Sequence, residues 1–322
     1  MMMMRISRLT VAALALGTML GTPAMAHRQW LLPSATTIDG EGAYVTFDAA
    51  TSEGLFDFDS FPIKIEGVVV TSPDGQAVQP ENISNGKRRG TFDLKLPKAG
   101  TYRIALVSAS VMANYMAGGE QKRFRGTEAE FATAVPKDAT DVRVSRSEGR
   151  VESFVTVGEP TATALAPVGK GLEVIPLTNP TENVVGTPAR FRVLVDGKPT
   201  PDIDITIVPG GGRFRANLGD MSVKSDAKGE ATVNWTGAGM VWLGASWPPR
   251  PASAPEGAGG PGGGAGGPGG QGRPRPEGAG GPGAGGPSAA GPGASGPGGP
   301  GGGRAMVPRR LSYSATYEVA PF

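Results

Sequence analysis

The stretch GTFDLKLPKAGTYRIAL, residues 90–106, decides the fold. Apolar and polar residues alternate on both sides of a short centre, which is the pattern of two half-buried strands. Pro97 and Gly100 favour a tight reversal between them, and Tyr102 opens the second strand as a core residue. This strand–turn–strand unit is typical of β-sandwich domains.

Strand-like segments of the same kind recur along the chain, separated by turn signals such as the Asp-Gly-Lys-Pro of residues 196–199. They cover residues 43–48, 63–70, 142–144, 151–157, 173–177, 191–195, 203–208 and 231–235. We therefore predict an all-β protein built of two antiparallel β-sandwich domains of the immunoglobulin-like or prealbumin-like kind, over residues 27–157 and 158–322. A capping threonine and early acidic residues predict one helix within residues 127–135.

The first 26 residues read as a secretory signal peptide. Arg5 and Arg8 precede an apolar run from Leu9 to Leu20, and a small-residue cleavage motif ends at Ala26. The apolar run is too short to span a membrane as a helix. We expect cleavage after Ala26 and export to the periplasm. Without the two arginines the mature chain balances 29 basic against 29 acidic residues.

Residues 251–303 form a Gly/Pro-rich segment that holds 25 of the 52 glycines and 11 of the 30 prolines. It lacks Val, Ile, Leu, Met and aromatic residues, so it cannot bury enough apolar surface to become ordered. Strand-like residues 240–247 precede it and residues 309–319 follow it. We predict a β-hairpin whose turn has been replaced by a long disordered loop; a plain spacer to a C-terminal tail is the alternative.

Composition excludes several classes of site. The chain has no cysteine and one histidine, so disulfides, thiolate metal sites and multi-histidine metal sites within one chain are ruled out. The sequence contains no cluster of basic residues of the kind that nucleic-acid-binding proteins carry, so nucleic-acid binding is not expected. No nucleophile–base pair, pair of catalytic acids or cofactor fingerprint is evident, and we expect a protein that is not an enzyme.

The mature start Ala-His-x-x-Trp-Leu-x-Pro, residues 26–33, resembles that of an exported family known as domain of unknown function 4198. The segments GLEVIPLTNP, residues 171–180, and FRVLVDGKP, residues 191–199, are similar to motifs of that family. Its members are often labelled the periplasmic component of an ABC-type cobalt or nickel uptake system. The resemblance implies two β-sandwich domains and a membrane transporter or another envelope protein as partner.

The candidate metal site begins at His27. After cleavage its free amine and its imidazole Nδ1 could chelate one ion, and nickel, cobalt and copper favour nitrogen ligands. Glu53, Asp57 and Asp59 could add carboxylates from the following loop. Two alternatives remain: His27 is simply the first residue of a strand, and residues 53–59 are a strand with one solvated face.

Three further features have ordinary structural explanations beside functional ones. Met112 and Met116 could bind Cu(I), but packing is the commoner role of methionine. The basic residues 122–126 could contact an anionic partner, although a solvated turn is the simpler interpretation. The tryptophans of the second domain could line a binding groove, or they could lie in the core: Trp235, Trp242 and Trp247.

Three functions remain open from these observations. The first is a non-catalytic periplasmic accessory or binding protein for nickel or cobalt uptake, with the ion at His27. The second is a binding or adhesion module that presents a β-sandwich surface to a protein or glycan. The third, a hydrolase with acids gathered around His27, has the least support.

Overall fold

The computed structural model describes residues 27–40, 42–215, 218–249 and 309–322. The predicted signal peptide and the Gly/Pro-rich segment 251–303 lie outside these ranges. Strands dominate the described chain, which confirms the all-β class. Besides the strands there are one α-helix and two 3-10 helices, η1 (Thr163–Leu165) and η2 (Gly212–Phe214).

The first sheet is antiparallel and contains the N-terminal strand. Its order is β1 (Arg28–Pro33), β3 (Ala43–Ser52), β7 (Gly90–Leu96) and β6 (Glu81–Asn85), and β4 (Phe61–Pro62) pairs with β3. Alternate residues of β7 are buried, as the period of two requires, while the edge strand β6 is exposed throughout. The buried residues of this sheet, such as Leu31, Phe47 and Phe92, form one core with residues of the second sheet such as Tyr102 and Ile104.

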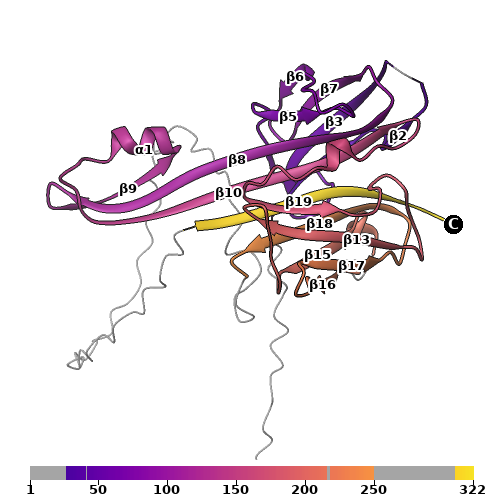
Figure 1. Ribbon diagram of the computed structural model, residues 1–322. Helices are drawn as coiled ribbons and strands as arrows, with labels where there is room; N and C mark the ends of the chain where they lie inside the picture. The colour runs from indigo at the N-terminus through magenta and orange to yellow at the C-terminus, as the bar shows by residue number, and fades with distance from the viewer. Residues whose placement is uncertain (1–26, 41, 216–217, 250–308) are drawn as a thin grey trace, which may run out of the picture.

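The second sheet has ten strands and runs through the whole molecule (Figure 1). Its path is β16 (Met221–Lys224), β15 (Asp204–Pro209), β18 (Gly239–Trp247), β19 (Arg309–Ala320), β10 (Thr140–Val157), β8 (Gly100–Ala117) and β5 (Val68–Thr71). Short strands pair along this path: β2 (Thr37–Ile38), β9 (Glu120–Gly126) and β12 (Asn183–Val184).

A third sheet closes the other core. It consists of β11 (Leu172–Pro176), β13 (Pro188–Val195) and β14 (Lys198–Pro199), with β17 (Glu230–Asn234) on β13. Its apolar side packs on β15, β18 and β19 of the second sheet, through residues such as Phe191, Trp235, Leu243, Tyr313 and Tyr317.

The sandwich-like architecture is therefore as predicted, but the second sheet is mixed and not wholly antiparallel. β10 pairs with β19 in parallel, from Arg146 opposite Arg309 to Ser153 opposite Thr316. Because β10 also pairs with β8, one sheet contributes to both cores. The division into domains at residues 157 and 158 stays a prediction.

The hairpin predicted across the Gly/Pro-rich segment is present. β18 and β19 are antiparallel neighbours, from Gly239 opposite Val319 to Trp247 opposite Leu311. The ends of the two strands therefore lie together although the sequence separates them widely.

The turn at the centre of the opening stretch also forms as predicted. Tyr102 is fully buried, and its hydroxyl donates to the Lys98 carbonyl while accepting from the Lys98 N–H, both at 2.8 Å. The strand predicted over residues 63–70 is shorter, because Gly67, with φ of 94°, turns the chain just before β5.

β8 and β10 extend beyond both cores as an arm that also carries β9 and α1 (Glu128–Ala134) (Figure 1). The helix is as predicted: Thr127 caps its first turn, and Glu130 completes the capping box. The turn expected at residues 122–126 is wrong, since these residues belong to β9 and pair with β8, but their charged side chains are solvent-exposed as expected. No helix in the described ranges has the length and apolar character needed to cross a membrane.

Candidate functional site

Strand register brings His27 and Glu53 together. Arg28 at the start of β1 lies opposite Ser52 at the end of β3, so the residues just outside this pair face each other. His27 Nε2 lies 3.6 Å from Glu53 Oε1, and the two side chains are 46% and 53% exposed. The histidine ring also lies 5.9 Å from the Phe61 ring, between ring centroids. The pair is accessible to an ion from solvent.

Asp59 shapes the loop that follows β3. Its carboxylate accepts the Glu53 N–H at 3.1 Å, the Gly54 N–H at 2.8 Å and the Ser60 hydroxyl at 2.9 Å. Partial burial raises the pKa of Asp59, but these hydrogen bonds outweigh it and hold the pKa below its ordinary value. The carboxylate is therefore ionised and occupied in holding the loop.

Asp57 has a different partner. Its Oδ1 lies 3.2 Å from Nη1 of Arg213, a residue of η2 between β15 and β16. In the described part of the chain, no group of three or more His, Asp or Glu side chains is placed to hold a metal ion. The structure thus brings together two of the four predicted residues, His27 and Glu53, while Asp57 and Asp59 have other partners.

Residues 53–59 form a loop, and the alternative of a strand with one solvated face is wrong. Phe56 has a positive φ of 64°, and both Phe56 and Phe58 contact the Trp30 ring, at 5.5 and 5.6 Å between centroids. Trp30 is fully buried and donates its indole N–H to Ser52 Oγ at 2.7 Å. These aromatic contacts fix the loop beside His27.

β1 also lies at the junction of the two cores. The Gln29 carbonyl accepts the indole N–H of Trp242 at 2.9 Å and the hydroxyl of Ser314 at 3.0 Å. The Arg28 guanidinium lies 5.6 Å from the Trp242 ring centroid. The backbone beside His27 is therefore held by both halves of the molecule. Trp242 is partly buried and packs against the small cluster around Trp30, so it joins β1 to β18.

A buried polar cluster crosses the second sheet and was missed from sequence. Glu152 is 2% exposed, lies 2.9 Å from Arg150 and 3.9 Å from Arg103, and accepts the Tyr313 hydroxyl at 2.8 Å. Burial and the nearby Glu152 charge raise the pKa of Tyr313 well above its ordinary value. The cluster is enclosed and has its charges paired, so its role is to join strands.

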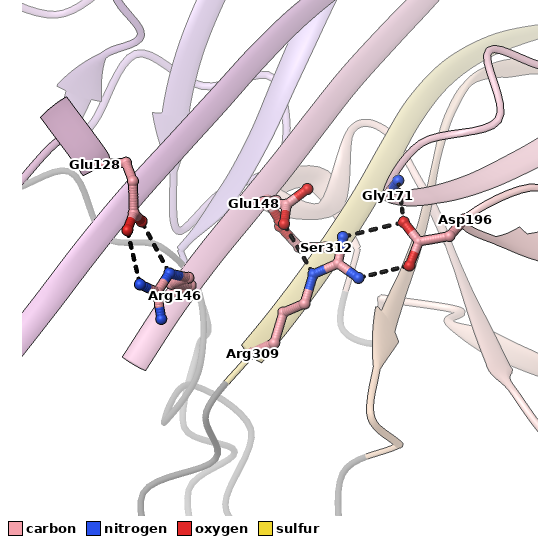
Figure 2. Close-up of polar contacts among 7 residues, drawn as sticks. All are labelled: Glu128, Arg146, Glu148, Gly171, Asp196, Arg309 and Ser312. Atoms are coloured by element: carbon pink, nitrogen blue, oxygen red, sulfur yellow. Dashed lines mark hydrogen bonds and ion pairs between the residues drawn. The ribbon is translucent and has the colours of Figure 1, made fainter. Parts of the chain in front are cut away.

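A cleft of about 330 Å³ lies where the arm leaves the body of the molecule. Figure 2 shows the ion pairs beside it: Glu128 with Arg146 in bidentate contact, and Arg309 between Glu148 and Asp196. These pairs lower the pKa of Asp196, mainly through the Arg309 hydrogen bonds, and raise that of Arg309. No sequence motif pointed to this cleft, because its walls come from five separate segments.

The remaining candidates occupy structural positions. Met112 and Met116 are partly buried on β8, and the Met112 sulfur accepts from Arg123 at 3.2 Å. Trp235 is a core residue, 3% exposed, as the packing interpretation predicts, while Trp247 packs against the edge of that core.

Comparison with known proteins gives a family and no activity. No curated protein matches the sequence. Among solved structures, the D0-D1 domain of intimin is similar at 13% identity, covering 67% of this chain and 88% of that one, with a TM-score of 0.18. A DUF4785 family protein from Legionella pneumophila is similar at 8% identity, covering 67% of this chain and 50% of that one, with a TM-score of 0.21. The trypsin-activated alpha-2-macroglobulin from Escherichia coli is similar at 14% identity, covering 70% of this chain and 15% of that one, with a TM-score of 0.21.

These scores are too low to carry a functional argument. The family model described as a domain of unknown function, DUF4198, matches residues 24–248 and so includes β1, the loop after β3 and most of both cores. The chain belongs to the DUF4198 family.

Proposed function

We propose that the chain is an exported, non-catalytic binding protein of the periplasm that carries nickel or cobalt at His27. The ion is cargo, and the site forms when cleavage after Ala26 makes His27 the first residue. The observation that supports this is the 3.6 Å approach of Glu53 to His27 Nε2 in an accessible position.

The donor set suits these ions. The amine and Nδ1 of an N-terminal histidine belong to one residue and can bind the same ion, and both are nitrogen donors of the kind nickel and cobalt accept. Glu53 lies at Nε2, the other nitrogen of the ring. A carboxylate there is placed to accept a hydrogen bond from Nε2–H, which leaves the Nδ1 lone pair for the metal and orients the ring. Glu53 thus has a positioning role, in place of the direct ligation first expected.

Two ligands from one residue leave most coordination positions to water. Such a site releases its ion readily, which suits delivery to a second protein that completes the ligand set. A membrane transporter or another envelope protein is the proposed recipient. The composition that argues against an enzyme and against nucleic-acid binding fits a carrier as well.

The test is isothermal titration of the signal-cleaved protein with Ni²⁺, Co²⁺ and Cu²⁺, after mass spectrometry has established that His27 is the first residue. We expect His27→Ala to abolish binding. Acetylation of the N-terminal amine keeps the imidazole but removes the amine as a donor, and should also abolish binding. Glu53→Gln should weaken binding by about tenfold, because the neutral amide is a poorer acceptor for Nε2–H.

Asp57→Asn is the matched control, since Asp57 pairs with Arg213 and is not a ligand in this proposal. Binding that survives both His27→Ala and acetylation of the N-terminal amine would exclude this site. The β-sandwich binding module would then be the better interpretation.

A further inference from the structure

The outer edge of β8 has a gap at the root of the arm. β8 pairs with β10 along one edge, from Gly100 to Met116. On its other edge, β5 covers Arg103–Leu106 and β9 covers Val111–Ala117. The four residues between, Val107–Ser110, have no strand beside them in the described chain.

These four residues are accessible. Val107, Ser108 and Ala109 are exposed, and Val107 retains 48% of its surface. In an antiparallel pair, successive residues direct their N–H and C=O groups alternately toward and away from the partner. Two of the four residues therefore direct both groups away from β10, where a further strand could bind them.

The cleft described above lies against this gap. Its lining includes residues 107–111 of β8, 146–150 of β10 and the exposed Val168. Among its charged residues, Arg146 pairs with Glu128, Arg150 with Glu152 and Glu148 with Arg309, so Lys170 supplies the positive charge that no described acidic residue pairs. The cleft therefore favours a ligand that carries apolar and acidic side chains.

We propose that Val107–Ser110 binds an extended acidic peptide segment of a partner protein, which adds to the sheet as an antiparallel strand between β9 and β5. Both flanking strands are antiparallel to β8, so an added strand running the same way continues their line. Four residues span about 13 Å, enough for two pairs of backbone hydrogen bonds. Every second side chain of the added strand lies over the cleft, beside Val107 and within the field of Lys170.

This mode of recognition gives affinity through the main chain and specificity through alternate side chains. The proposed peptide site is independent of the proposed metal site, which lies at the start of β1 and shares no residue with the cleft.

The probe is a fluorescein-labelled seven-residue peptide, Thr-Val-Glu-Val-Glu-Val-Thr, capped at both ends, with the lysine analogue as the charge control. Fluorescence polarisation is measured on the signal-cleaved full chain. We expect the glutamate peptide to bind at least about tenfold more tightly than the lysine peptide. Lys170→Glu should reverse that preference, and hydrogen exchange should show new protection confined to residues 107–110.

Ser108→Pro and Ala109→Pro form a matched pair. Proline removes one N–H, which points outward in one of these residues and toward β10 in the other. The outward variant keeps the thermal stability of the parent and loses peptide binding; the other is destabilised. Absence of binding by the glutamate peptide, equal binding of the two peptides, or undiminished binding in the stable proline variant would each overturn the proposal.

Discussion

Two tyrosines on β19 make a matched pair for a stability test. Tyr313 and Tyr317 are both buried, at 2% and 1% exposure, and both pack in the same core. The Tyr313 hydroxyl donates to Glu152 at 2.8 Å. The Tyr317 hydroxyl makes no hydrogen bond of ordinary geometry within the described ranges, although the Tyr313 side chain is near enough to affect its pKa. Phenylalanine removes the hydroxyl from either residue and leaves the ring in place.

The two substitutions should change stability in opposite directions. A hydrogen bond to a charged group contributes about 1.5–3 kcal/mol, and Glu152 keeps its arginine partners, so Tyr313→Phe should cost about 2 kcal/mol. A buried polar group without a partner costs about 1–3 kcal/mol, so Tyr317→Phe should stabilise the protein by about 1 kcal/mol. The expected difference between the variants is about 3 kcal/mol.

Guanidinium unfolding followed by tryptophan fluorescence measures this difference, since Trp235 lies 6.4 Å from the Tyr317 ring. Equal m-values in the two variants are required before the free energies of unfolding are compared. Destabilisation of both variants by the same amount would refute the reasoning, because it would show that the two hydroxyls have equivalent surroundings.

The same tyrosines predict loss of stability at alkaline pH. Burial, with the Glu152 charge, raises the pKa of Tyr313 and Tyr317 in the folded state, so above pH 10 the unfolded chain loses protons that the folded one keeps. The free energy of unfolding should therefore fall by up to about 1.4 kcal/mol per pH unit for each tyrosine, and either phenylalanine variant should halve the slope. Thr127→Ala removes the cap of α1 and should speed hydrogen exchange in the helix, at a local cost of about 1 kcal/mol, while the global unfolding midpoint stays unchanged. Gly244→Ala places a Cβ 2.0 Å from the Trp242 ring, so the ring must move, and an altered tryptophan emission with a loss of about 1–3 kcal/mol is expected.

Local features were predictable because a few adjacent residues determine them. The cap at Thr127, the turn before Tyr102 and the alternation in β19 are each encoded within about a dozen residues. The strand expected at residues 63–70 fails for an equally local reason that alternation cannot show: Gly67 takes a positive φ and turns the chain.

Pairings between distant segments were not predictable. The parallel contact of β10 with β19 joins residues more than 150 positions apart, and no turn signal marks it. Glu152 lies between Val151 and Ser153, and besides the nearby Arg150 its partners are Arg103 and Tyr313, 49 and 161 residues away, so its burial cannot be inferred from its neighbours.

The candidate site was predictable in part. The start of the mature chain and the nearby acids indicated His27 and Glu53, but it is the register of β1 on β3 that makes them neighbours. Sequence spacing could not show that Asp59 binds backbone N–H groups or that Asp57 contacts Arg213. Each of those carboxylates looks like an available ligand until the loop conformation is known.

The long ladder between β8 and β10 has a mechanical consequence. The two strands remain paired from the arm to the centre of the molecule, from Thr140 opposite Met116 to Val157 opposite Gly100. A tensile force applied at the arm tip along the strand axis pulls β8 and β10 in the same direction, so it loads in shear the hydrogen bonds that join β8 to β5 and β10 to β19, and many of these must break together. A pull across the strands would instead break them one after another. A partner that pulls the arm along the strand axis would therefore transmit force to both cores before the arm separates from the neighbouring strands.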